Sequence, residues 1–243
     1  MKHRTQRNHI SRRCFLQGTS LVIASSFAGL EQVLAGDDST ALNIGLITDL
    51  HYADKEPSGT RYYRETLAKI DETSREFAKP ESRPTFLIEL GDLVDAADSA
   101  ETELRYLSTI NGRLQKICER RYYVLGNHCV DTLTKNEFLG HVEQERTFYS
   151  FDEAGFHFIV LDACFRKDGE PYGRKNFQWT DTAIPESELT WLQSDLKATQ
   201  LPTIVLVHQR LDVSDNHGVK NCEVIRQMLE AHGKVMAVFQ GHS

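Results

Sequence analysis

The sequence predicts an α/β protein, because short apolar runs alternate with longer stretches of helical periodicity from residue 41 onward. The apolar runs are nearly continuous, which is typical of strands that are buried on both faces of a sheet. Two of these runs flank Glu153-Ala154-Gly155, a hairpin signal, so we expect mixed sheets and not purely parallel ones. With 40% hydrophobic and 26% charged residues, the composition is that of an ordinary globular protein.

Three strand–helix pairs are expected in the first half of this α/β region. The apolar runs predict three strands, at residues 41–48, 84–90 and 122–125. Each run is followed by a stretch in which apolar residues recur every three or four positions, as on one face of a helix. These helices are expected at residues 61–77, 99–118 and 134–141.

The second half is expected to begin with the two hairpin strands, residues 147–151 and 156–162. Residues 163–184 contain Gly169, Pro171 and Gly173, and we expect them to form a surface loop that shapes the substrate site. Helix and strand patterns then alternate to the end, and Pro185 suits the first turn of its helix. These elements are a helix at 185–199, a strand at 202–207, a helix at 219–232 and a strand at 235–239.

The first 35 residues have the three-part layout of an export signal. Residues 1–13 are basic and contain no acidic residue, residues 14–30 are mildly apolar, and Val33-Leu34-Ala35 suits signal peptidase cleavage before Gly36. Ser11-Arg12-Arg13-Cys14-Phe15-Leu16 resembles a twin-arginine signal, which implies export of an already folded protein by the twin-arginine machinery to the periplasm or the exterior. The alternative is an amphipathic N-terminal helix. We therefore predict a signal peptide at 1–35 and one domain at 36–243.

The charge balance argues against nucleic acid as a partner. The formal net charge is −7; without residues 1–35, Lys plus Arg falls from 28 to 23 and Asp plus Glu from 35 to 34, which gives −11. An acidic body without a basic run is a poor general binder of nucleic acid or anionic lipid. No apolar run is long and pure enough for a membrane-spanning helix, so no stable membrane anchor is expected.

The four cysteines that follow the leader leave their pairing open, because four cysteines in an exported protein allow three disulfide connectivities. They are Cys118, Cys129, Cys164 and Cys222. Since no C-x-x-C pair is present, neither a zinc ribbon nor a thioredoxin-type site is suggested.

Five expected strands end in side chains that can bind a metal or move a proton. These are Asp49 with His51, Asp92, Asn127 with His128, His208, and His242. Strand ends of an α/β fold meet at one crevice, and a mixed set of oxygen and imidazole ligands suits Mn, Fe or Zn. Taken singly, these residues have ordinary alternatives: Asp49 as a turn residue, Asp92 or Asp95 as a helix N-cap, Asn127 after Gly126 as an ordinary turn, His208 as a satisfied core histidine, and His242 as part of a frayed chain end.

The order of these motifs resembles that of the calcineurin-like metallophosphoesterases. The matching motifs are Asp49-x-His51, Gly91-Asp92, Gly126-Asn127-His128, the lone His208 and Gly241-His242. The resemblance implies an αββα sandwich of mixed sheets and two divalent metal ions. It also implies a hydrolase that cleaves phosphate esters or pyrophosphates of small molecules by in-line attack of metal-bound hydroxide. Residues 47–56 and Arg61-Tyr62-Tyr63-Arg64 look most like the branch of manganese-dependent ADP-ribose and CDP-alcohol pyrophosphatases.

The resemblance also implies a role for each matching residue. Asp49 and His51 would bind the first metal, and Asp92 would bridge both metals. Asn127, His208 and His242 would bind the second metal. His128 would act on the leaving group without binding metal.

The sequence departs from the family pattern in two places. The family's last motif is G-H-x-H, whereas the sequence given stops at Ser243, so we expect a truncated chain with an incomplete second sheet, an uncovered sheet edge and weak binding of the first metal. The alternative function is a metal-poor, non-catalytic remnant. Cys129 also stands where the family has an acid that orients the histidine; Asp131 is a candidate substitute.

Several other polar residues are ambiguous. Arg61 and Arg64 could bind a distal phosphate, although a solvated helix face is the favoured interpretation. The histidines outside the motifs are expected to be structural or on the surface: His141, His157, His217 and His232.

Overall fold

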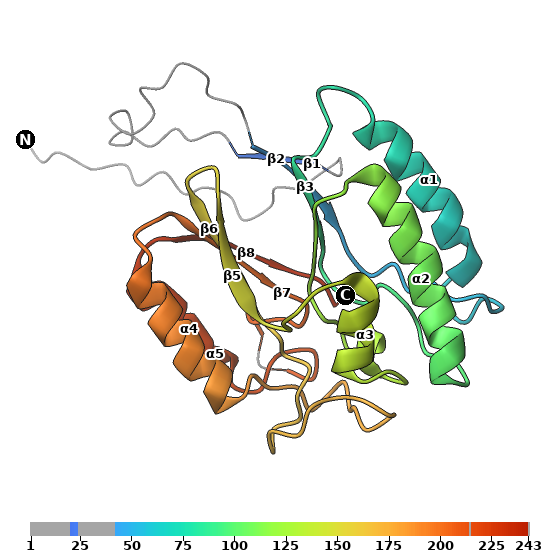
Figure 1. Ribbon diagram of the computed structural model, residues 1–243. Coiled ribbons are helices and arrows are strands. Elements are labelled where there is room, and N and C mark those ends of the chain that lie inside the picture. Colours follow the sequence, from blue (N-terminus) through green and yellow to red (C-terminus); the bar gives the residue numbers. More distant parts are fainter. Residues whose placement is uncertain (1–19, 24–41, 214, 243) are drawn as a thin grey trace, which may run out of the picture.

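Two four-stranded sheets face each other in the computed structural model, and helices cover their outer faces (Figure 1). The structure describes residues 20–23, 42–213 and 215–242. The predicted αββα sandwich of mixed sheets is therefore confirmed.

Each sheet combines one antiparallel pair with parallel neighbours. The first has the order β1 (Ser20–Ile23), β2 (Leu42–Ile47), β3 (Phe86–Glu89) and β4 (Arg121–Tyr123), in which β1 is antiparallel and the others are parallel. The second has the order β5 (Tyr149–Glu153), β6 (Phe156–Val160), β7 (Thr203–Val207) and β8 (Val235–Gln240), in which only β5 is antiparallel. Because parallel strands share their direction, their carboxyl ends lie at one edge of each sheet.

The helices form the outer layers (Figure 1). Helices α1 (Thr66–Phe77), α2 (Ala100–Ile117) and α3 (Lys135–Val142) pack on the first sheet, and α4 (Glu186–Ala198) and α5 (Cys222–His232) pack on the second. Ser99 caps α2 by accepting a hydrogen bond from the backbone N–H of Thr102, and Thr134 and Glu137 form a capping box on α3. Neither Asp92 nor Asp95 caps a helix, so that alternative is wrong.

The apolar residues form three separate clusters, one for each space between layers. Along β3, Phe86 and Ile88 face the cluster between the two sheets, whereas Leu87 faces the helices. Along β7, Ile204 and Leu206 face the central cluster and Val205 faces α4 and α5. This period of two explains why β3 and β7 are nearly continuous apolar runs: every position in these two strands is buried on one side or the other.

The helices begin one to five residues later than predicted, and α5 begins at Cys222 instead of at residue 219. The first helix begins at Thr66, because Ser58 and Arg61 exchange two backbone hydrogen bonds in a tight turn and residues 63–65 form a 3₁₀ turn. Pro185 is the N-cap of α4, with ψ 156°, and does not lie in its first turn. Residues 163–184 contain no helix and no extended strand, as predicted for a loop.

The N-terminal leader stays a prediction, because most of residues 1–35 lie outside the described part of the chain. Ser20–Ile23 is described as β1, at one edge of the first sheet. At the far edge of the second sheet lies β8, on which Met236 and Val238 are exposed.

No helix in the described residues is long and apolar enough to cross a membrane. All four cysteines that lie in the described residues are free thiols.

Candidate active site

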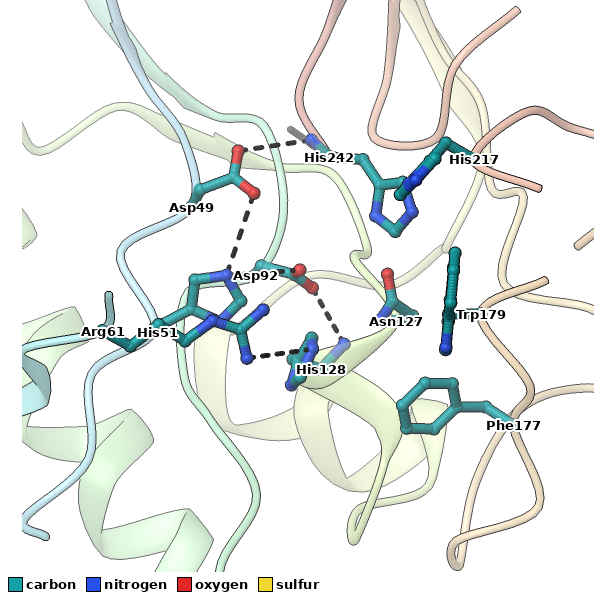
Figure 2. Close-up of a pocket in the computed structure, with 10 residues that line it drawn as sticks. All are labelled: Asp49, His51, Arg61, Asp92, Asn127, His128, Phe177, Trp179, His217 and His242. Atoms are coloured by element: carbon teal, nitrogen blue, oxygen red, sulfur yellow. Dashed lines mark hydrogen bonds and ion pairs between the residues drawn. The ribbon is translucent and has the colours of Figure 1, made fainter. Parts of the chain in front are cut away.

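The predicted ligands meet in one pocket at the carboxyl ends of strands from both sheets. Asp49 and His51 follow β2, Asp92 follows β3, Asn127 and His128 follow β4, and His242 follows β8. Figure 2 shows these side chains turned toward a common centre. His208, directly after β7, lies beneath them and is fully buried.

Four of these residues have a left-handed backbone. The φ angles are 53° at Asp49, 44° at His51, 59° at Asp92 and 61° at His242. A side chain disfavours this region, and strain of this kind is typical of functional sites. Hydrogen bonds between strand ends stabilise this strained backbone: Asp49 N–H donates to Gly91 O (3.0 Å), and His51 N–H donates to Asp92 O (2.8 Å).

The glycines that precede the ligands are required by space, and Gly91, with φ 100°, also by conformation. A Cβ on Gly91 would lie 2.4 Å from Nδ1 of His208, and one on Gly241 would lie 2.4 Å from Oγ1 of Thr48. Gly126 is not in the left-handed region, so it does not act through a special turn; a Cβ there would lie 2.2 Å from Oδ1 of Asp92. Each glycine lets one strand end approach the next.

Asp92 lies at the centre of the cluster. Its Oδ2 is 3.6 Å from Nε2 of His51 and 3.1 Å from Nε2 of His208, while its Oδ1 accepts a hydrogen bond from the backbone N–H of His128 (2.8 Å). On the His51 side, Asp49 Oδ1 lies 3.8 Å from Nε2 of that histidine. Donor atoms within 4.8 Å of one another form two groups that share Asp92: Asp49 with His51, and His208 with His242.

The buried donor atoms fit metal ions. Oδ1 of Asn127 and Nε2 of His242 have no solvent contact and no hydrogen-bond partner, and Nε2 of His208, equally buried, lies 3.1 Å from Oδ2 of Asp92 without the geometry of a hydrogen bond. The other ring nitrogen of His208, Nδ1, lies 2.7 Å from the carbonyl oxygen of Leu90, which turns Nε2 toward the pocket. Unpaired buried polar atoms are rare and costly, and a divalent cation between the two groups would satisfy all three. His208 is therefore not the satisfied core histidine of the alternative interpretation.

The charges of the cluster depend on one another. Burial would raise the pKa of Asp92, but the neighbouring His208, His128 and His51 outweigh it and hold that pKa below its usual range. Burial would likewise lower the pKa of His208, but Asp92 raises it to about 9. His242 lies further from the carboxylates, so burial dominates and lowers its pKa to about 4.

A carboxylate that the sequence did not reveal lies beside His128. Nδ1 of this histidine lies 3.4 Å from Oδ2 of Asp95, and the same oxygen lies 3.2 Å from Nδ1 of His51. Cys129 is fully buried in the apolar core between the first sheet and its helices, where burial raises the pKa of its thiol. It therefore does not orient His128. Asp95, and not Asp131, is the acid within reach of His128.

A model of the calcineurin-like phosphoesterase family matches residues 42–243. The chain belongs to this family. The resemblance carried by the five strand-end motifs is thereby confirmed.

Two curated relatives are manganese-dependent ADP-ribose/CDP-alcohol diphosphatases, from Xenopus laevis (29% identical over 91 residues) and Xenopus tropicalis (28% over 91). Each match covers 35% of this chain, and it spans about a quarter of the relative, 26% and 27%. A crystal structure of a dimetal phosphatase from Danio rerio has a TM-score of 0.71 and 19% identity, covering 83% of this chain and 81% of that one. It shows that the fold is shared.

Four further residues of the phosphoesterase pocket were not assigned to it from the sequence: Arg61, Phe177, Trp179 and His217. Arg61 lies outside any helix and reaches Asp95 Oδ2 (3.1 Å) and His128 Nε2 (3.4 Å), so the solvated-face interpretation is wrong for it. That interpretation holds for Arg64, which pairs with Asp54 and Glu56 at the surface. His217, expected to be structural or on the surface, is exposed and also lines the pocket, where its ring lies 5.9 Å from that of His242.

Proposed function

We propose that this phosphoesterase is a metal-dependent hydrolase of phosphate esters or diphosphates, with two divalent ions. The observation that carries the proposal is the position of Asp92, whose carboxylate lies between the two donor groups. A carboxylate has two oxygens and can therefore bind two cations at once. Asp49 and His51 would complete the first site, and Asn127, His208 and His242 the second.

When bound, two ions would polarise the phosphoryl group and provide the nucleophile for in-line attack. Oxygen and imidazole donors suit Mn, Fe or Zn, and the curated relatives are named as manganese-dependent enzymes. We therefore favour manganese. The amide of Asn127 contributes an oxygen without a further negative charge, which keeps the site electrophilic.

His128 is placed to act on the leaving group. Its Nδ1 lies 3.4 Å from Oδ2 of Asp95, and its Nε2 lies in the pocket, 3.4 Å from Nη1 of Arg61. A histidine in this position can hydrogen-bond or protonate the leaving oxygen, a contribution of roughly 10²–10⁴-fold when it acts as an acid. His128 thus needs no bond to metal.

The substrate is proposed to be a small molecule with a diphosphate. The relatives from Xenopus are named as diphosphatases of ADP-ribose and CDP-alcohols, and Arg61 adds a cation to the same pocket. An arginine beside the metal ligands can bind the phosphate that is not being attacked.

The test is hydrolysis of ADP-ribose and of bis(p-nitrophenyl) phosphate with added Mn²⁺. Wild type is expected to cleave at least one, Asp92→Asn to cleave neither, and Asp98→Asn, at an exposed position outside the pocket, to match wild type. Wild type that cleaves neither substrate, or Asp92→Asn with full activity, contradicts the proposal.

We also propose that the protein is exported through the twin-arginine pathway. Support comes from Arg12-Arg13, the apolar stretch after it and the cleavage site before Gly36. Residues 1–35 fused to a reporter that folds in the cytoplasm should carry it across the membrane, and replacing both arginines by lysine should stop this. Export that survives the double replacement contradicts this pathway.

A further inference from the structure

One wall of the pocket is aromatic, and the metal-binding groups do not account for it. Phe177 and Trp179 come from the loop 163–184 and face the metal ligands across the cavity. In Figure 2 the indole of Trp179 is seen edge-on, so one of its faces looks toward Asn127 and the centre of the pocket. The wall therefore offers a flat apolar surface within reach of a phosphoryl group at the metals.

Trp179 is exposed although it lies in a pocket. It is 46% exposed, whereas the other aromatic ring of the wall, Phe177, is only partly exposed. Ligand pockets are typically lined by aromatic side chains together with a few convergent polar groups, and Trp179 lines this cavity beside the candidate metal ligands. A flat ring bound against the indole would cover its exposed face.

Aromatic neighbours and the hydrogen bonds of Tyr172 hold the loop that carries the wall. The ring of His217 lies 5.0 Å from the indole of Trp179, and Phe177 lies 5.6 Å from the ring of Tyr172. The hydroxyl of Tyr172, a nearly fully buried residue, lies 2.9 Å from the carbonyl oxygens of both Gln178 and Asp181, on either side of the tryptophan. An aromatic surface that is fixed before the ligand arrives loses little conformational entropy on binding.

A cationic side chain lies on the other side of the pocket. Arg61 is separated from the aromatic wall by the metal ligands and His128 (Figure 2). The pocket thus presents, in order, an aromatic face, a phosphoryl-binding centre and a cation. A substrate that fits this order has a flat ring system at one end, a phosphate at the centre and a second phosphate toward Arg61.

We propose that Trp179 is the specificity-determining residue that stacks on the nucleobase of a nucleoside diphosphate-linked substrate, with Arg61 on the phosphate that is not attacked. The kinetic part of this inference rests on the proposed hydrolase function. Every nucleobase has a π-face, so the wall selects for a base without reading its edges. A sugar phosphate or an alkyl phosphate would leave the indole exposed.

Binding is tested first without catalysis. The second of the two tryptophans, Trp191, lies on α4 outside the pocket and packs against Phe148. Trp191→Phe therefore leaves Trp179 as the single tryptophan fluorophore. With EDTA and again with Mn²⁺, AMP is expected to quench this fluorescence, while ribose 5-phosphate is not. Trp179→Ala, which keeps Trp191, should show no quenching by AMP. Absence of AMP quenching under both conditions, or equal quenching by ribose 5-phosphate, overturns the proposal.

Kinetics then separate base recognition from phosphate chemistry. The ratio of KM for ADP-ribose to KM for dimethyl diphosphate, which has no base, should rise about 10–100-fold in Trp179→Ala and less in Trp179→Phe. Tyr62→Ala removes a side chain that is 51% exposed and lies outside the pocket, and it should leave the ratio unchanged. An unchanged ratio in Trp179→Ala refutes the assignment. If wild type cleaves neither compound, the hydrolase proposal fails, and AMP quenching still decides the role of Trp179.

Discussion

The substitution Gly126→Ala adds one methyl group at the point where two strand ends approach each other most closely. The new Cβ would lie 2.2 Å from Oδ1 of Asp92 and 2.3 Å from its backbone nitrogen. Rotation of the Asp92 side chain relieves the first contact but not the second. The strand end that carries Asn127 must therefore move away from the strand end that carries Asp92.

The size of this movement follows from the contact distances. Real Cβ contacts essentially never fall below 3.0 Å and become ordinary at 3.4 Å, so the separation from Asp92 N must grow by 0.7 Å (3.0 minus 2.3) to 1.1 Å (3.4 minus 2.3). Misplacement of about 1 Å in an active site costs on the order of 100-fold in rate. Forced overpacking costs about 1–3 kcal/mol, which in a domain of this size lowers Tm by roughly 2–12 °C.

The assay compares Gly126→Ala with Gly112→Ala, since a Cβ at Gly112 in α2 meets nothing within 4 Å. We measure bound metal per chain, kcat with Mn²⁺ and Tm for both variants. Gly126→Ala should lose metal from the second site and about 100-fold in kcat, whereas Gly112→Ala should keep both and gain up to about 1 kcal/mol from helix propensity. Full metal content and full kcat in Gly126→Ala would refute the close-approach argument.

The remaining predictions concern metal, Asp95 and His157. Mn²⁺ at 100 times its Kd should add about 2.7 kcal/mol to the free energy of unfolding, seen as a rise in Tm that EDTA reverses; no shift contradicts the metal site. Asp95→Asn should lower kcat about 10–100-fold through the loss of orientation of His128, whereas the exposed Asp98→Asn should not; equal rates would exclude Asp95 as the orienting group. Asp195 is the main cause of the raised pKa of His157, so this histidine stabilises the fold fully below about pH 6.5 and loses that contribution as pH rises through the raised pKa. The Tm advantage of wild type over His157→Gln should therefore shrink from pH 6 to pH 9; a gap that is constant or widens would contradict this.

The strand ends were predictable because their signal is local. An apolar run that is buried on both faces ends where polar residues begin, and the direction of parallel strands brings those ends to one edge. Asp49, Asp92 and His208 each follow such a run by one to three positions. Their convergence in one pocket follows from strand direction alone.

Asp95 and Arg61 were not predictable in the same way, because their roles depend on contacts between distant segments. Asp95 follows a strand end and equally resembles a helix N-cap, and only the folded chain shows Ser99 in that role. Arg61 fits a helical pattern in sequence, yet the turn at Ser58 ends before the helix and turns the guanidinium toward Asp95. The spacing of apolar residues within one segment gives no information on either contact.

The aromatic wall could not be predicted from the sequence for a different reason. Residues 163–184 have no periodicity that predicts where a side chain points, so only a role for the whole loop could be inferred. The orientation of Trp179 depends on Tyr172, a buried residue of the same loop, and on His217, which comes from the segment after β7. Two distant parts of the chain must be in place before the indole faces the pocket.

The backbone of the site connects metal binding to stability. Four ligands with left-handed φ angles cost of order 1–3 kcal/mol each, a sum comparable to the whole stability of a typical domain. The sheets can hold this strain because the central cluster beneath the strand ends is almost fully buried, for example at Phe158 and Leu206. The clustered carboxylates and unpaired imidazole nitrogens add a second cost that no packing relieves. Divalent cations would remove that second cost, so we expect the folded state to be more stable with metal bound than without it.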